Sequence, residues 1–205
     1  MIKKHQERIK IMAEKGKGSY GYLKKQAVKQ GLLALGLLTV CAAIFLIGFF
    51  WLTQHNTILT VIAVLGLLPV AKFIVSMILF MKAEKFSCVP HLYEEVMKIA
   101  GDKKDSLLAG FDFYLTSYDK NFPLSVACVD KGCLIAYTPW EKCDCNKCRE
   151  HFEEYMKKNG ISGINIKVFT DEKKFLERFT QLCEDKKDAT ENEKAMYRLL
   201  LNLSL

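Results

Sequence analysis

Two apolar runs decide the fold: GLLALGLLTVCAAIFLIGFFWL at residues 31–52, and TILTVIAVLGLLPVAKFIVSMILFM at residues 57–81. The first run has 22 residues and no charge, and the second has one charged residue, Lys72. About 20 apolar residues in a helix cross the roughly 30 Å hydrocarbon core of a bilayer. The polar link TQHN at 53–56 is short enough for a tight turn. Residues 31–81 are therefore predicted to form a transmembrane helical hairpin.

The basic residues lie mainly on one side of this hairpin. Residues 1–30 contain nine Lys and Arg against Glu7 and Glu14, which accounts for the whole net charge of +7. The link at 53–56 contains none. Since basic flanks stay in the cytoplasm, the sequence predicts a multi-pass protein of the plasma (inner) membrane with two spans and both termini cytoplasmic. The remaining chain is neutral, so a nucleic-acid partner is not expected.

Residues 1–30 are predicted to be a basic juxtamembrane arm. One hypothesis places a helix near residues 1–15 on anionic headgroups, and the alternative is a solvated arm that only fixes orientation. The run GKGSYG at 16–21 predicts a flexible break before a helical approach to the first span. The candidate membrane-surface residues are Lys3, Lys4, Arg8, Lys10, Lys24, Lys25 and Lys29.

Lys72 is the intramembrane charge of the second run. A helix that starts near residue 57 places it about 22 Å along its axis, within about 8 Å of the inner boundary of the core. The favoured interpretation is that its side chain extends to the interface. A transport or proton-relay role is the alternative, although neither run contains an acidic partner.

Residues 82–205 are predicted to be a cytoplasmic α+β domain with the order α-β-β-β-α-β-α-α and a mostly antiparallel sheet. In the first strand, alternation puts Phe111, Phe113 and Leu115 on one side and Asp112 on a solvated face. The predicted elements are a helix at 87–100, strands at 107–117, 122–129 and 133–138, a helix at 146–158, a strand at 164–169, and helices at 172–184 and from a capping box at 190–193 to about 203.

A cysteine cluster is the densest candidate site. Three thiols and an imidazole fall within nine residues, and tetrahedral zinc accepts such ligands: Cys143, Cys145, Cys148 and His151. A fourth ligand from elsewhere, Cys133 or Cys128, is an open alternative because so short a segment closes all four ligands only with strain. Stable disulfides are not expected in a reducing cytosol, so the other interpretations are an exposed loop with incidental cysteines and reversible thiol oxidation.

The element order αβββαβ resembles the core of the restriction-endonuclease-like nucleases. That resemblance implies an acidic residue on the second strand and a Glu-x-Lys or Asp-x-Lys on the third. Residues 133–138, CLIAYT, contain neither, so the sequence departs from the motif and favours a degenerate domain over an active nuclease. No Gly-x-Ser-x-Gly, phosphate loop, dinucleotide fingerprint or HExxH motif occurs either.

The sequence thus favours a membrane-anchored binding, scaffold or sensor domain that acts without catalysis, with the bilayer and a protein at the membrane as its partners. A zinc-binding or thiol-redox regulator centred on residues 143–148 is the first alternative, and zinc is the one cofactor it would need. A degenerate restriction-endonuclease-like domain is the second.

Overall fold

The computed structural model describes residues 16–51, 58–101, 107–117, 120–184 and 189–205, with the backbone alone at 48–51, 58–60 and 63. The expected surface helix, with Lys3, Lys4, Arg8 and Lys10, and the expected turn at 53–56 lie outside these residues. Internal contacts divide the chain into two units. One is residues 23–85, and the other, here called the domain, combines 16–22 with 86–205.

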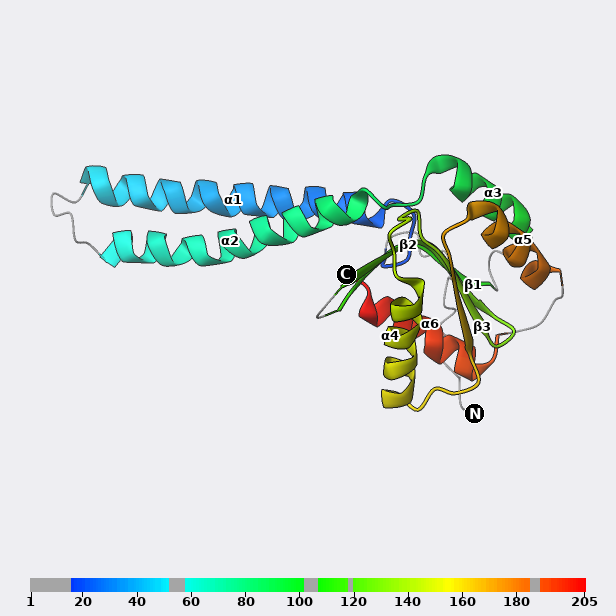
Figure 1. Cartoon of the computed structure of the whole chain (residues 1–205). Helices are drawn as coiled ribbons and strands as arrows, with labels where there is room; N and C mark the ends of the chain where they lie inside the picture. Colours follow the sequence, from blue (N-terminus) through cyan, green and yellow to red (C-terminus); the bar gives the residue numbers. More distant parts are fainter. Residues whose placement is uncertain (1–15, 52–57, 102–106, 118–119, 185–188) are drawn as a thin grey trace, which may run out of the picture. The chain divides into compact units, whose positions relative to one another are not determined.

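The first unit consists of two long helices, α1 (Tyr22–Trp51) and α2 (Ile58–Glu84) (Figure 1). Both are long and apolar enough to cross a membrane. Only 11% of the most apolar window of each helix is buried, and side chains such as Leu32 and Leu68 are about 70% exposed. Helices in the core of a water-soluble protein bury such residues, so this surface is suited to an apolar surrounding.

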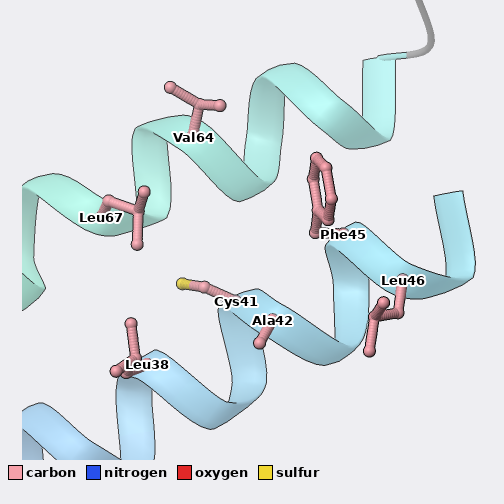
Figure 2. Close-up of a pocket in the computed structure, with 7 residues that line it drawn as sticks. All are labelled: Leu38, Cys41, Ala42, Phe45, Leu46, Val64 and Leu67. Carbon is pink, nitrogen blue, oxygen red and sulfur yellow. The ribbon is translucent and has the colours of Figure 1, made fainter. Parts of the chain in front are cut away.

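Glycines bring the two helices together. A Cβ on Gly31 would lie 2.9 Å from Met77 Sδ, and one on Gly66 would lie 2.6 Å from Cys41 Sγ. These contacts fix the antiparallel register of the helices. Beside the second contact is an apolar cavity of about 340 Å³, in which the Cys41 sulfur points between the helices (Figure 2). It is lined by Leu38, Cys41, Ala42, Phe45, Leu46, Val64 and Leu67.

The domain is built on a four-stranded sheet with the strand order β1-β2-β3-β4. The strands are β1 (Leu108–Thr116), β2 (Asn121–Asp130), β3 (Cys133–Tyr137) and β4 (Asn165–Phe169). The first three form an antiparallel meander, and β4 pairs with β3 in parallel. Lys131 and Gly132 both have positive φ in the β2–β3 turn, as a two-residue hairpin with right-handed strand twist requires.

Helices cover both faces of the sheet, giving three layers (Figure 1). On one face lie α3 (Pro90–Ala100) and α5 (Glu172–Cys183), whose apolar stripes include Leu92 and Phe179. On the other lie α4 (Cys145–Lys158) and α6 (Glu191–Leu203), with Phe152 and Leu200 buried. The prediction of a mixed helix and sheet domain with a mostly antiparallel sheet is confirmed.

The predicted alternation along β1 is wrong at one point. Phe111 packs in the core beneath α3 and α5, whereas Phe113 and Leu115 pack in the core beneath α4 and α6. The change of face occurs at Asp112, whose φ of 58° is left-handed and turns the following residues over. Simple period-two alternation assumes extended backbone throughout and therefore misplaces Phe111.

The predicted flexible break at residues 16–21 is also wrong, because this segment packs along the free edge of β1. Phe111 N donates to Gly18 O over 2.8 Å, and a Cβ on Gly18 would lie 3.1 Å from Leu201 Cδ2 and 3.2 Å from the Tyr197 hydroxyl. Farther along the same edge, Leu205 N donates to Tyr114 O. Two segments of the chain thus form hydrogen bonds with backbone groups of β1 that an open edge strand would leave exposed.

The first turn of α6 is fastened to the β2–β3 turn. The predicted capping box is confirmed, with the Thr190 hydroxyl accepting from Glu193 N and the Glu193 carboxylate accepting from Thr190 N. The other carboxylate oxygen of Glu193, which is 5% exposed, accepts from Gly132 N over 2.6 Å. One buried carboxylate therefore holds a helix start and a sheet turn together.

We expect Glu193→Ala to destabilise the domain by about 2–3 kcal/mol, because both N–H groups lose a charged acceptor. The matched control is Glu191→Ala in the same helical turn, which removes an exposed ion pair with Lys194 and should cost at most about 0.5 kcal/mol. Denaturant unfolding of the full chain in detergent, followed by tryptophan fluorescence, measures both. Equal losses in the two variants would contradict the assignment.

Candidate functional site

Within the domain, Asp112 on β1 binds the chain segment that precedes α1 and the chain segment that follows α2. Its side chain is 1% exposed, which corrects the prediction of a solvated-face residue. One carboxylate oxygen accepts from Gly21 N over 2.6 Å and the other accepts from Cys88 N over 2.8 Å. Gly21 immediately precedes α1, and Cys88 follows the end of α2. A carboxylate offers only acceptors, so two backbone N–H donors are suitable partners for it in a buried position.

Ser125 provides a third attachment beside Asp112. The register of β1 and β2 pairs Phe111 with Val126 and Phe113 with Leu124, and so places Asp112 opposite Ser125. The Ser125 hydroxyl is buried and donates to Phe86 O over 2.8 Å. The two polar side chains of this strand pair thus bind the backbone of the segment that follows α2 at two positions.

Aromatic and basic side chains extend the contact of the N-terminal segment. The rings of Tyr20 and Tyr93 stack with centroids 4.3 Å apart, and Tyr20 also meets the Phe111 ring edge-on at 6.4 Å. Lys17 Nζ donates to Ser204 O over 2.7 Å. We call residues 16–21 and 86–89, with Asp112 and Ser125, the junction. Its chemistry is suited to holding two backbone segments in place, since its polar side chains bind main-chain groups.

We expect Asp112→Gly to loosen both segments, because glycine accepts the left-handed φ but removes the carboxylate. Hydrogen bonds to charged groups contribute about 1.5–3 kcal/mol, so amide exchange should accelerate by roughly tenfold or more at 16–22 and 86–92. Hydrogen exchange read by mass spectrometry measures this.

The matched variant is Asp112→Asn, which tolerates the same φ and keeps one acceptor oxygen, so we expect a smaller effect. Exchange within α6 is the internal control. Unchanged exchange at both segments in Asp112→Gly would show that the carboxylate does not hold the junction.

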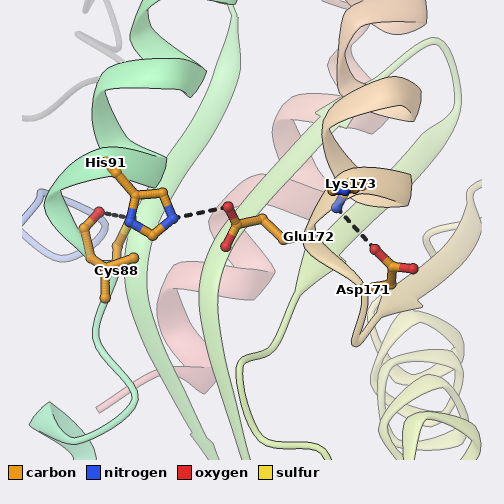
Figure 3. A network of polar contacts seen from close by, with 6 residues as sticks. Cys88, His91, Asp171, Glu172 and Lys173 are labelled. Atoms are coloured by element: carbon orange, nitrogen blue, oxygen red, sulfur yellow. Dashed lines mark hydrogen bonds and ion pairs between the residues drawn. The ribbon is translucent and has the colours of Figure 1, made fainter.

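Cys88, His91 and Glu172 have the residue types of a nucleophile, a base and an acid, and Figure 3 shows His91 between the other two. His91 Nε2 lies 2.9 Å from Glu172 Oε1, and its side chain is 63% exposed, which links α3 to α5 at the surface. The Cys88 thiol instead donates to Val89 O. Burial, with the nearby Asp112 carboxylate, raises the pKa of this thiol to about 12. A thiol that stays protonated is a poor nucleophile.

The predicted cysteine site lies at the start of α4. Asp144 caps the helix by accepting from Lys147 N, as Asp171 caps α5 by accepting from Lys173 N (Figure 3). Cys148 is wholly buried in the core beneath α4 and α6, and Cys143 is 8% exposed at its rim. Cys145 is half-buried and donates to Cys143 O. Within the described ranges, no group of three or more His, Cys, Asp or Glu side chains is arranged to hold a metal ion.

The electrostatics of this segment keep its thiols protonated and its imidazole neutral. Burial raises the pKa of Cys143 to about 11 and raises the pKa of Cys145 and Cys148 as well. Burial also lowers the pKa of His151, whose ring packs against Phe122 and Tyr155. His151 Nε2 has no hydrogen-bond partner among the described residues. The zinc and redox interpretations stay predictions.

We expect unequal effects when the two cysteines nearest the helix start are changed. Cys148→Ser places a hydroxyl in an apolar core and should cost about 1–3 kcal/mol, whereas Cys145→Ser should cost less than about 0.5 kcal/mol. Thermal unfolding and zinc content of the full chain in detergent measure this. About one zinc per chain, lost from both variants together with stability, would instead establish a structural zinc site.

The other predicted site residues occupy exposed positions. Lys24, Lys25 and Lys29 are exposed on the first turns of α1, and Lys72 is exposed in α2. The β3 strand contains no acidic residue, and the Asp112 carboxylate on β1 accepts hydrogen bonds from two backbone N–H groups. The Glu-x-Lys or Asp-x-Lys that the resemblance implies for the third strand is therefore absent from β3.

Sequence reasoning missed the junction, although it left two signals. Asp112 is the only charged residue in the apolar run LLAGFDFYL, and a glycine-rich run directly precedes α1.

Comparison of the chain with family models, with curated proteins and with solved structures finds no match.

Proposed function

We propose that the chain is a membrane-anchored binding protein whose hairpin crosses the bilayer twice and whose domain engages a protein partner at the cytoplasmic surface. The observation that carries this proposal is the junction. Residues 16–22 and 86–205 belong to one unit, with Gly21 and Cys88 bonded to the same carboxylate. If α1 and α2 each span the bilayer, the segments before and after them must then lie on one side.

Charge supports the cytoplasm as that side. Lys24, Lys25 and Lys29 lie at the start of α1, and Lys82 and Lys85 lie at the end of α2, so the basic residues adjoin the segments that enter the domain. Such residues favour retention in the cytoplasm. Lys72 lies about 21 Å along α2, close enough to the same end for its long side chain to reach the interface.

Binding accounts for the domain better than catalysis does. The polar side chains buried in the sheet, Asp112 and Ser125, bind main-chain groups, and burial raises the pKa of the Cys88 thiol. The same pair connects the first two strands of the sheet, β1 and β2, to the two chain segments that continue into the helices. A scaffold or sensor needs such a fixed attachment between its binding domain and its anchor.

Topology reporters test the anchoring. We expect the full chain to stay in the membrane after alkaline carbonate, with green fluorescent protein fluorescent at either terminus and alkaline phosphatase active only when inserted at residues 53–56. A photo-crosslinker at Lys98, exposed on α3, should yield a discrete protein adduct in intact cells.

Deletion of residues 31–81 is the matched control, and it should abolish both membrane retention and the adduct. Release by carbonate, or active phosphatase at a terminus, would contradict the proposed anchoring. Catalytic turnover by the full chain, lost on changing one carboxylate, would contradict the binding role.

A further inference from the structure

We propose that lysines from both helices form one collar that binds anionic phospholipid headgroups in preference to zwitterionic ones. This inference rests on the proposed function, since it requires the hairpin to span a bilayer. The collar consists of Lys24, Lys25, Lys29, Lys82 and Lys85.

The glycine contacts place these lysines at one level. Gly31 packs against Met77, and six residues along each antiparallel helix from this contact lie Lys25 and Ala83. Lys24, Lys82 and Lys85 are therefore within about one helical turn of Lys25, and Lys29 is one turn nearer the apolar segment. Basic residues adjoin both runs in the sequence, and the register of the helices places them at one level.

The collar lacks counter-charges of its own. All five side chains are exposed, and none forms an ion pair with any residue that the structure describes. Glu84 is the one acidic residue in the sequence from 23 to 85. Some cations of the domain are paired with a carboxylate, as Lys120, Arg149 and Lys158 are.

The position of the collar identifies the missing counter-charge. Beyond it, both helices expose large apolar side chains, including Leu32, Leu35 and Ile78. If these side chains meet lipid tails, the lysines adjoining them lie at the level of the lipid phosphates. A lysine near an anionic surface gains about fivefold in binding, so several at one level favour lipids such as phosphatidylglycerol over phosphatidylcholine.

Lipid selectivity of the full chain tests the proposal. The chain is reconstituted in bilayers that contain spin-labelled phosphatidylglycerol or phosphatidylcholine, and the motionally restricted fraction of each label is measured. We expect a preference of roughly fivefold for the anionic lipid, which salt weakens. The collar variant combines Lys24→Gln, Lys25→Gln, Lys82→Gln and Lys85→Gln, and its preference should fall close to one.

A matched variant removes four exposed lysines of the domain and has the same net charge: Lys98→Gln, Lys142→Gln, Lys157→Gln and Lys173→Gln. It should keep the wild-type preference. Equal preference in the collar variant and the wild type, or equal loss in both variants, would overturn the collar. Displacement of the labelled lipid by millimolar glycerol 1-phosphate would overturn the lipid assignment in favour of a free phosphate site.

Carbonate extraction of the wild type is done first and separates the two proposals. Release from the membrane contradicts the proposed function itself. Retention without any preference for phosphatidylglycerol overturns only the collar.

Discussion

The buried carboxylate of Asp112 is the interaction on which the arrangement of the domain depends. It accepts hydrogen bonds from the backbone N–H groups of Gly21 and Cys88, and the Ser125 hydroxyl beside it donates to the carbonyl oxygen of Phe86. A buried carboxylate without partners would be costly, so the sheet is stable in this form only with both segments in place. The left-handed backbone at the same residue also sends Phe111 to one core and Phe113 to the other.

Local patterns were sufficient to predict most of the elements. The helix predicted at 172–184, the capping box predicted at 190–193 and the strand predicted at 164–169 each depend on residues a few positions apart, and each is present. The two apolar runs were equally clear, because length and composition alone define them. Such features are encoded where they occur, so a single sequence reveals them.

The junction was not predictable in this way, because its partners are far apart in the chain. The sequence alone predicts Asp112 to be a solvated polar position in an alternating strand. Asp112 becomes buried only because residues 16–21 cover the edge of β1. The cysteine segment shows the opposite error. Its spacing favours metal chemistry, yet Cys148 is one of the buried residues of the core beneath α4. The sequence shows which residue types lie close together in the chain, but it does not show the direction in which their side chains point.

The bond between Gly21 and Asp112 joins residues 91 positions apart, with the whole hairpin between them. During synthesis, residues 16–21 leave the ribosome long before β1 exists, so the edge of the sheet is completed only after both helices have been made. A chain inserted with its first helix reversed would leave Gly21 across the bilayer from Asp112. If the two helices span the bilayer as proposed, completion of this domain depends on correct insertion, and misinserted molecules would keep an uncovered strand edge that quality-control proteases and chaperones recognise.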